Sequence, residues 1–572
     1  MQEAYFYDIY HDFISLTRNF FTGVNKIVLT DWVFNCILKI VRKEILLFYL
    51  KIFKRLNTPF KIANFSFCRY QERVFIIQPE KGLEITYSEV ARRVEKIAAF
   101  FKGIEIKREE VVGFFSENCR EYFEIRCACH LSGLIFFSLP SHLNEEDIIY
   151  FLNITEVKVF FYRNYGGLNL GRIRQQTQVK YFVDLEGRLY QGIFQKGKGF
   201  FKQTYKSEAI ATFNLSSGTT GKTPKIVQLS GKNWTASLYN YLRSSDMRIN
   251  KKIRFLSTLP LATAGSTTFL PSMLGGATNI VMQKDFSPQV VAHCIKKYNV
   301  THLYISPSWF LEFFQWCKQN NERFPSLESI ILGTEKIPWL RLKEAIVFFG
   351  PIFTVGYGMV EALPPLSLLF PRDYYVRGKI RERLLRSVGR ILKGVKIKIL
   401  EGKFTIDGRR GGRILIKSNT VGRGYLEKAG IKEVSFKHKW FYSSDYGFVD
   451  REGFLYLLGR EEEIIVREGK AYFAQELEDR LYELSFINRC AVIEGNKGIF
   501  VFISLRERFN MEKEEARCRV FEFCRRNWDE FLLPYDIIVE ESLPINFLGK
   551  LDRKQLGRKV EHFKEGDLKI DC

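Results

Sequence analysis

Apolar and polar residues follow one another along the chain in the rhythm of alternating strands and helices. Apolar runs at 111–115, 134–137 and 157–161 are typical of buried strands. Residues 121–132 and 145–152, which lie between these runs, have the spacing of helices. Strands that alternate with helices in this way form βαβ units, whose strands lie parallel in one sheet. The pattern therefore predicts an α/β fold built on mainly parallel sheets.

The same pattern divides the chain into parts. Between 388 and 460 it breaks into short alternating segments separated by glycines, which predicts antiparallel β structure. Beyond the charged stretch 459–463, helical and strand-like segments mix again. We therefore predict a helical N-terminal extension, a large domain of parallel βαβ sheets with a distorted antiparallel β region, and a small α+β C-terminal domain, over 1–65, 66–460 and 461–572.

Residues 31–56 have the pattern of a basic amphipathic helix. From Lys39 to Arg55 the segment holds six basic residues and one acid, Glu44, between apolar positions. Such a helix binds an anionic membrane surface in some proteins. The simpler interpretation is a helix that packs on its own protein, with the basic side chains reaching outward. The sequence leaves both interpretations open.

Composition narrows the class of protein. A chain of 572 residues with 46% hydrophobic residues has enough apolar surface for more than one folded core, which excludes a disordered chain. The net charge of +23 is spread along the chain and no groove-reading motif accompanies it, so no nucleic-acid partner is expected.

The expected compartment is the cytoplasm, with membrane association as the alternative that the 31–56 helix raises. The eleven cysteines contain no CxxC pair, which favours a reducing compartment. Glu3, Asp8 and Asp12 interrupt any secretory signal, and no apolar run approaches the length of a membrane span.

A loop rich in glycine, hydroxyl groups and lysine follows the apolar residues 210–213. Glycines let the backbone approach a ligand and present its N–H groups, while hydroxyls and lysine add donors and charge. The loop therefore indicates a polyphosphate cradle made of Ser216, Ser217, Gly218, Thr219, Thr220, Gly221 and Lys225. Residues 216–223 nearly match the Walker loop GxxxxGK[ST], which would indicate a P-loop phosphohydrolase.

Later motifs indicate a different nucleotide chemistry. They are TVGYGMVE at 354–361, WFYSSDYGFVD at 440–450, the Gly459-Arg460 pair and the Pro544…Gly549-Lys550…Arg553 series. These segments resemble the motifs of the adenylate-forming, or AMP-binding, superfamily, and of the acyl-CoA synthetases within it. Residues 85–89 resemble the first motif of that family. A Walker enzyme explains none of the later motifs.

The resemblance implies two half-reactions and a role for each motif. A carboxylate and ATP give an acyl-adenylate and pyrophosphate, and a thiol, usually that of CoA, then takes the acyl group. Lys550 would contact the reacting oxygens and Glu361 would hold Mg²⁺. The remaining nucleotide contacts would come from the phosphate loop and from Gly333, Thr334, Glu335, Tyr357, Gly358, Asp445 and Arg460. The C-terminal domain would swing between the half-reactions about a hinge at Glu463.

Several positions depart from the family pattern. Thr223 adds a residue to the phosphate loop, Val360 replaces a common Thr, and Ser443-Ser444 replaces Thr-Gly before Asp445. One lost hydrogen bond of about 0.5–1.5 kcal/mol slows catalysis without abolishing it. We therefore expect an active enzyme. The alternative is a degenerate ATP-binding or membrane-scaffold protein without catalysis.

The acid substrate is expected to be apolar. Thr263 lies in the segment that resembles the family's acid pocket, and Val360 and Leu363 extend its lining. No acidic residue occurs between Arg254 and Asp285 to pair an ammonium group, which disfavours a free amino acid. We favour a fatty or aromatic acid transferred to CoA. The alternative hypothesis is that the enzyme passes the acyl group to the phosphopantetheine of an acyl carrier protein.

Overall fold

The computed structural model describes most of the chain from residue 56 to residue 561. The described ranges are 56–163, 167–195, 206–216, 224–243, 250–283, 286–406, 409–427, 430–432, 436–437, 439–506, 509, 511–547 and 549–561. The predicted helix at 31–56 lies outside these residues apart from its last position. No helix within the described ranges is long and apolar enough to cross a membrane.

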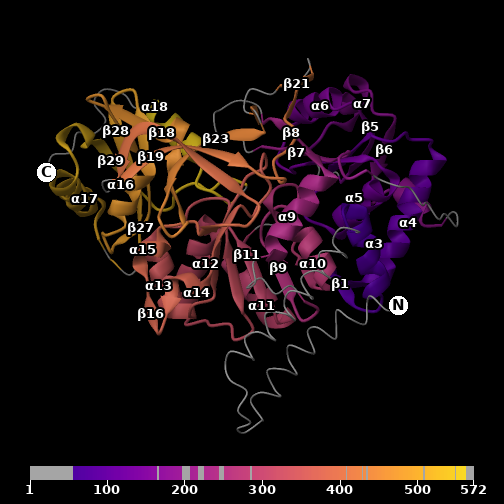
Figure 1. Ribbon diagram of the computed structural model, residues 1–572, viewed down its shortest axis with the longest axis horizontal. Coiled ribbons are helices and arrows are strands. Elements are labelled where there is room, and N and C mark those ends of the chain that lie inside the picture. Colours follow the sequence, from indigo (N-terminus) through magenta and orange to yellow (C-terminus); the bar gives the residue numbers. More distant parts are fainter. Residues whose placement is uncertain are drawn as a thin grey trace, which may run out of the picture.

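Two large sheets form the body of the molecule (Figure 1). The first has the order β17-β14-β13-β12-β11-β9-β10-β1-β2, and its six strands from β13 to β1 are parallel. Its strands are β1 (Val74–Gln78), β2 (Leu83–Thr86), β9 (Arg254–Ser257), β10 (Thr278–Val281), β11 (His302–Ile305), β12 (Ser329–Leu332), β13 (Phe353–Tyr357), β14 (Ser367–Leu369) and β17 (Arg390–Ile391).

The second sheet has the order β21-β20-β8-β7-β4-β3-β5-β6, and its strands from β7 through β6 are parallel. They are β3 (Val111–Phe115), β4 (Ile135–Leu139), β5 (Val157–Tyr162), β6 (Tyr181–Asp184), β7 (Ile210–Leu215), β8 (Ile226–Ser230), β20 (Tyr425–Glu427) and β21 (Gly430–Lys432). The strands and helices predicted from the pattern between 111 and 161 are all present.

Helices fill the space between the sheets and cover their outer faces. The largest apolar core joins β1 and β3 to the helices between the sheets, α3 (Pro59–Arg69), α4 (Tyr87–Gly103), α5 (Arg120–Ser132), α9 (Gly231–Arg243) and α10 (Phe269–Gly275). A second core covers the first sheet with α11 (Pro288–Tyr298), α12 (Pro307–Gln319) and α13 (Trp339–Phe349). A third core covers the second sheet with α6 (Glu145–Ile154) and α7 (Leu170–Gln176). The apolar strand runs are thus buried on both faces, as parallel sheets require.

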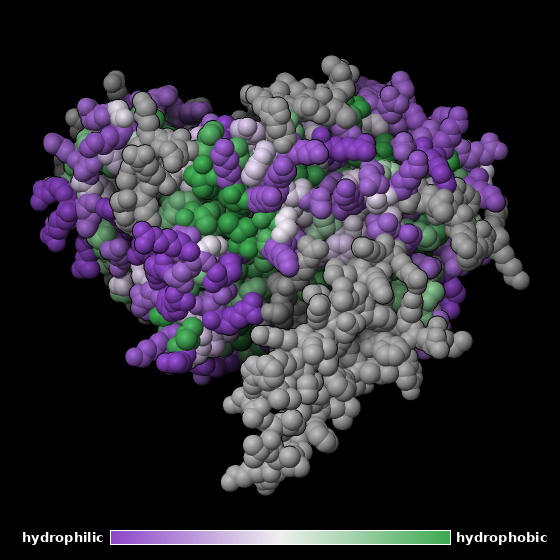
Figure 2. Space-filling model, in the orientation of Figure 1, coloured by the Kyte–Doolittle hydropathy of each residue, from purple (hydrophilic) through white to green (hydrophobic). Residues whose placement is uncertain are grey.

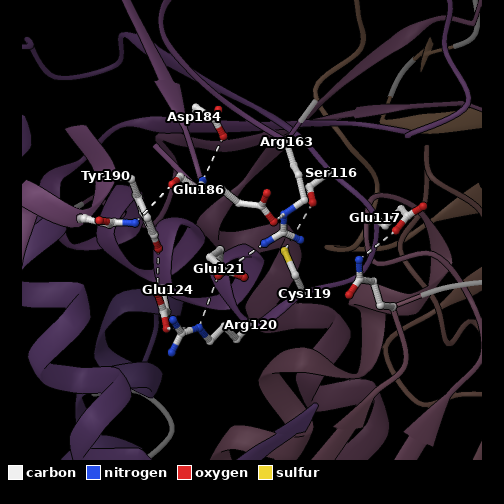
Figure 3. Close-up of polar contacts among 12 residues, drawn as sticks. Ser116, Glu117, Cys119, Arg120, Glu121, Glu124, Arg163, Asp184, Glu186 and Tyr190 are labelled. Carbon is white, nitrogen blue, oxygen red and sulfur yellow. Dashed lines mark hydrogen bonds and ion pairs between the residues drawn. The ribbon is translucent and has the colours of Figure 1, made fainter. Parts of the chain in front are cut away.

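Buried ion pairs tie α5 to its neighbours at the carboxyl ends of β5 and β6 (Figure 3). Arg163 follows β5, and its guanidinium lies 3.6 Å from Glu121 and 3.1 Å from Glu186. The fully buried Glu124 pairs with Arg93 at 2.7 Å and accepts a hydrogen bond from Tyr190 of α8 (Arg188–Ile193). Removing one partner would leave a buried charge uncompensated, so the ion pairs hold α5 against the neighbouring elements.

An antiparallel sheet follows the two parallel ones, as the glycine-separated segments predict. It has the order β18-β19-β23-β22, with β24 paired to β23. The strands are β18 (Lys396–Ile406), β19 (Arg409–Lys417), β22 (Phe436–Lys437), β23 (Trp440–Val449) and β24 (Leu455–Arg460). Figure 2 shows an apolar area near the centre of one face, where Figure 1 places the strands around β23.

The last part of the chain has its own apolar cores and an α+β structure. The hairpin β25 (Ile464–Arg467) and β26 (Lys470–Phe473) leads to a three-stranded sheet of β27 (Ile487–Gly495), β28 (Gly498–Leu505) and β29 (Pro534–Glu540). The helices α16 (Ala474–Leu481), α17 (Lys513–Asn527) and α18 (Arg553–Glu561) accompany it. The predicted fold class, a large α/β domain with a distorted antiparallel region and a small α+β domain, is confirmed.

Candidate active site

The candidate site lies at the carboxyl ends of β12 and β13, where open parallel sheets commonly bind ligands. Gly333 and Thr334 follow β12, and Gly358 follows β13. Two adjoining cavities of about 670 and 880 Å³ meet here. Both are lined by Thr334, Gly358, Asp445, Arg460 and Lys550. Residues predicted from five separate motifs therefore share one space.

Asp445 is held between Tyr357 and Arg460. The Tyr357 hydroxyl donates a 2.7 Å hydrogen bond to Asp445, and Arg460 Nε lies 3.5 Å from the other carboxylate oxygen. Asp445 and Arg460 are register partners on β23 and β24. Ser443, a departure from the family pattern, accepts the Asp445 N–H at 3.2 Å and donates to the Ile414 carbonyl. The serine thus orients the acid that it precedes.

Glu361 lines the larger cavity, and its carboxylate contacts a residue that the sequence did not single out. Tyr425 of β20 donates a 2.9 Å hydrogen bond to it. The Tyr425 ring also lies 4.8 Å from the Lys225 ammonium. Burial raises the pKa of Glu361, and the Tyr425 hydrogen bond opposes that rise. Only strand pairing between β20 and β8 brings Tyr425 to this place, so no local signal identified it.

The acidic groups of the site fit a magnesium ion that is held mainly by phosphates. Mg²⁺ in nucleotide sites commonly takes one or two protein carboxylates and completes its shell with phosphates and waters. Within the described ranges, no group of three or more His, Cys, Asp or Glu side chains forms a protein-only metal site. Glu361, the carboxylate expected to hold the ion, lines the larger cavity, as Lys225 does.

Lys550 is half-buried at the junction of the two cavities. Burial, together with the nearby Arg460 guanidinium, lowers its pKa to about 8. Gly549 has a φ of 72°. A Cβ atom there would lie 2.6 Å from Ser306 Oγ and 2.7 Å from the Trp309 ring. The glycine is therefore required for the turn that brings Lys550 against α12.

The Gly333-Thr334-Glu335 segment contributes to the candidate site in two ways. Thr334 has a φ of 79°, which is strained for a β-branched residue, and its hydroxyl is buried without a hydrogen-bond partner in the part of the chain described. Glu335 accepts the Ser308 N–H at 2.8 Å and the Leu551 N–H at 3.4 Å. Glu335 thus also fastens the Lys550 segment to the large domain, a role that its motif did not indicate.

The base of the phosphate loop settles the choice between the two nucleotide chemistries. Ser216 donates its N–H to the Lys225 carbonyl at 2.9 Å, and the Lys225 N–H donates to Ser216 Oγ at 3.1 Å. The loop joins β7 to the antiparallel β8, whereas a Walker loop leads from a strand into a helix. The Walker alternative is therefore wrong. The predicted contacts Ser217, Gly218, Thr219, Thr220 and Gly221 lie outside the described residues.

The predicted pocket residues Thr263, Val360 and Leu363 all line the larger cavity. Structure adds Trp234 and Tyr241 from α9, Thr267 from the 3₁₀ turn Ala264–Thr268, and Tyr304 from β11. None of the residues that these three elements contribute to the cavity is charged. The sequence did not indicate α9 and β11 because their contributions come from distant parts of the chain.

Side chains from the large domain hold the C-terminal part in place beside the site. Lys336 pairs with Asp479 at 2.7 Å, and Glu344 pairs with Arg506 at 2.9 Å. Glu463, the predicted hinge, is in the short 3₁₀ helix Glu461–Glu463 and lies 3.4 Å from Arg553.

Known proteins share both the sequence pattern and this architecture. Residues 66–426 match the AMP-binding enzyme family. The chain belongs to this family. A 2-succinylbenzoate–CoA ligase of Listeria monocytogenes is 22% identical over 85% of this chain and 96% of that protein. The medium/long-chain-fatty-acid–CoA ligase FadD8 of Mycobacterium tuberculosis is 27% identical over 61% of each chain.

A solved structure shares this fold. The anthranilate CoA ligase AuaEII, solved with anthranoyl-AMP, superposes on this AMP-binding enzyme with a TM-score of 0.77 over 88% of this chain and 97% of that one, at 18% identity. The predicted class of acid–thiol ligase, with ATP, Mg²⁺ and CoA as its cofactors, is that of the family.

Proposed function

We propose that this AMP-binding enzyme activates an apolar carboxylic acid as its acyl-adenylate and then transfers the acyl group to CoA. The observation that carries the proposal is the position of Lys550. It lies half-buried where the two cavities meet, and both cavities are also lined by Asp445 and Arg460. A cation beside the acid that we assign to the ribose suits stabilisation of the charge that develops between a carboxylate and a phosphate.

In the first half-reaction, a carboxylate oxygen attacks the α-phosphorus of ATP. A new P–O bond forms, the bond to the bridging oxygen breaks, and pyrophosphate leaves. Lys550 stabilises the negative charge that develops on these oxygens, as a positioned cation does in such a transfer. Asp445, oriented by Tyr357 and Arg460, accepts hydrogen bonds from the ribose hydroxyls. Magnesium, when bound at Glu361, supplies charge neutralisation of the phosphates.

In the second half-reaction, the thiol sulfur attacks the acyl carbon. The thioester bond forms, the bond from the acyl carbon to the adenylate oxygen breaks, and AMP leaves. We propose that residues 461–572 turn about Glu463 between the two steps, which removes Lys550 from the site. Many of the contacts across the boundary are polar, including Lys336–Asp479 and Glu344–Arg506, and polar contacts of this kind suit a change between two positions.

An apolar acid is favoured by the uncharged wall of the larger cavity. Trp234, Leu363 and Tyr304 line that wall, and an ammonium group there would lose its hydration without gaining a partner. The relatives' names point to 2-succinylbenzoate and to fatty acids as substrates of those proteins. We infer a fatty or aromatic acid here. Transfer to a carrier protein, and ATP binding without catalysis, are the alternatives.

The deciding experiment follows pyrophosphate release from ATP and Mg²⁺ with a panel of fatty and aryl acids, with and without CoA. We expect release with an apolar acid, and CoA-dependent formation of AMP and a thioester. Release without a thioester would favour a carrier-protein acceptor. Bound ATP without release for any acid would contradict the catalytic proposal.

Lys550→Ala tests the residue on which the proposal depends. We expect adenylate formation to fall by about 100-fold or more, because one preorganised charge contact is removed. Lys559→Ala on the following helix α18 is the control, since Lys559 is exposed and pairs with Glu540. Unchanged adenylation in Lys550→Ala would refute the assigned role.

A further inference from the structure

Two aromatic rings meet across the boundary between the large domain and the C-terminal part. His142 lies three residues after β4, in the turn that leads to α6. Phe547 lies three residues before Lys550. The two rings stack with their centroids 3.1 Å apart and their planes 21° from parallel. This contact, which we call the His142–Phe547 stack, joins the second sheet to the segment that presents Lys550.

The stack belongs to the candidate active site. Both of its members line the larger cavity, as do Ser216 and Lys225 at the base of the phosphate loop. Phe547 also lines the smaller cavity, so it stands, like Lys550, where the two cavities meet. The contact is therefore made in the wall of the same space that the phosphate loop and Lys550 share.

The turn that contains Phe547 and Lys550 is held tightly by its own backbone. Asn546 donates its N–H to the Lys550 carbonyl at 2.7 Å, and Gly549 donates its N–H to the Asn546 carbonyl at 2.8 Å. The Lys550 N–H donates in addition to Asn546 Oδ1 at 3.2 Å. A displacement of Phe547 is therefore passed on to Lys550.

This Lys550 turn has contacts on two sides. On one side, Glu335 accepts the N–H of the residue after Lys550 at 3.4 Å, and a Cβ atom at Gly549 would lie 2.7 Å from the Trp309 ring. Both of these contacts are with the first sheet and its helix α12. On the other side, the stack reaches His142 of the second sheet. A reacting group that is held from two sides keeps the geometry that transfer between bound reactants requires.

The chemistry of the stack suits a contact that forms and breaks. Both side chains keep part of their surface exposed, 38% in the case of Phe547. Desolvation lowers the pKa of His142 to about 4, so its ring is neutral near pH 7 and stacks without a counter-ion. Aromatic pairs contribute modestly beyond the area that they bury. The stack therefore holds the turn without locking it.

We propose that His142 and Phe547 are positioning residues, whose stack holds the Lys550 turn against the second sheet during adenylate formation and opens before thioester formation. The inference rests on the proposed function, because it assigns the stack to the first half-reaction. Phe547 and Lys550 both lie beyond Glu463, so rotation about that residue carries them away together. His142 stays with the large domain, and the rotation separates the two rings.

The first test measures the two half-reactions in single turnovers of His142→Ala and Phe547→Ala, with the acid that gives the most pyrophosphate release. We expect adenylate formation to slow by about tenfold in each variant, equivalent to about 1.4 kcal/mol, as loss of one aromatic pair predicts. Thioester formation from preformed adenylate should stay the same or become faster. Equal slowing of both half-reactions, or unchanged adenylation in both variants, would overturn the inference.

His142→Phe is the conservative variant, because it keeps a ring that stacks on Phe547. We expect it to form adenylate within about twofold of the unmodified rate. A loss as large as that in His142→Ala would contradict a role for stacking. Tyr150→Ala is the control, since Tyr150 of α6 is 42% exposed and lines neither of the two cavities described. It should keep the full rate.

The double variant His142→Ala/Phe547→Ala tests whether the two side chains act through one contact. We expect it to lose no more than either single variant, because the same contact is removed in all three. Losses that multiply to about 100-fold would show that the two residues act independently.

Hydrogen exchange separates this inference from the proposed function, because it needs no turnover. Mass spectrometry of the full-length protein with a non-hydrolysable ATP analogue follows the peptide 545–551. We expect its amides to exchange about tenfold faster in His142→Ala than in the unmodified protein or Tyr150→Ala. Faster exchange, without pyrophosphate release by the unmodified protein for any acid, would support the stack's hold on the turn and contradict the proposed function. Release with unchanged exchange in His142→Ala would support the proposed function and contradict the stack's role.

Discussion

Lys550 illustrates how surroundings set the behaviour of a single residue. Burial and Arg460 disfavour its charged form and lower its pKa to about 8, whereas Glu335, Asp445 and Glu463 favour the charge. The protonated form is needed to stabilise the phosphate oxygens. It predominates below about pH 8 and is lost as the pH rises through that value.

We therefore predict that kcat/KM for adenylate formation falls as the pH rises above about 8. This parameter reports groups of the free enzyme, where Lys550 has its lowered pKa. Pyrophosphate release measured from pH 6 to 10 gives the profile. A profile that stays flat until the ordinary lysine range near pH 10.4 would show that burial does not control Lys550 in solution.

Tyr425 provides a second prediction at this scale. Tyr425→Phe removes the hydrogen bond to Glu361 and keeps the ring that faces Lys225. Because that bond lowers the pKa of Glu361, its loss should raise the pKa further and move the acidic limb of the rate profile to higher pH. We expect a roughly tenfold lower rate at limiting Mg²⁺. An unaltered Mg²⁺ dependence would mean that Tyr425 does not act through Glu361.

At the scale of elements, the turns after the strands shape the site more than the strands do. In the turn after β13, Gly358 lies against Pro364, and both residues line the larger cavity. A Cβ atom at Gly358 would lie 2.6 Å from Pro364 Cα. Backbone atoms cannot move aside as a flexible side chain does, so this turn tolerates only glycine.

Gly358→Ala should therefore destabilise the fold by about 1–3 kcal/mol and weaken binding of both ATP and the acid. Thermal unfolding and calorimetric titration check the two effects. The control is Gly192→Ala in α8, where an added Cβ meets no atom within 4 Å and a helix gains stability from alanine. Full activity and stability in Gly358→Ala would contradict the close approach to Pro364.

At the scale of the whole molecule, the position of the C-terminal part depends on polar contacts across the boundary, which include buried hydrogen bonds from Arg341 to the Ile487 carbonyl and from Arg489 to the Ser308 carbonyl. Lys336–Asp479 and Glu344–Arg506 join residues of the large domain to residues beyond 461. Partly exposed pairs of this kind contribute about 0–1 kcal/mol each, so they bias the position without locking it.

We predict that the double variant Asp479→Asn/Glu344→Gln slows adenylate formation by about tenfold or less and leaves thioester formation from preformed adenylate unchanged or faster. The reason is that only the first half-reaction needs Lys550 in place. Single-turnover measurements of the two half-reactions provide the test. Glu522→Gln, which removes an exposed pair within α17, is the control. Equal slowing of both half-reactions would contradict the proposed rotation.

The sequence by itself determined the α/β class and the order of the site motifs. Buried parallel strands appear as continuous apolar runs, as at 111–115 and 157–161, and these runs need no knowledge of the partner strands. Motifs such as Gly549-Lys550 are equally local, because a glycine that permits a turn must stand next to the residue that the turn presents.

Only the tertiary structure decided which distant residues meet. It paired β7 with the antiparallel β8 through contacts outside the loop, which agrees with the case that the later motifs already made against a Walker enzyme. It brought Tyr425 to Glu361, and it grouped Tyr241, Thr267 and Tyr304 in one cavity. The physical reason is that strand pairing and packing join segments far apart in the chain, and a single sequence carries no direct record of those contacts.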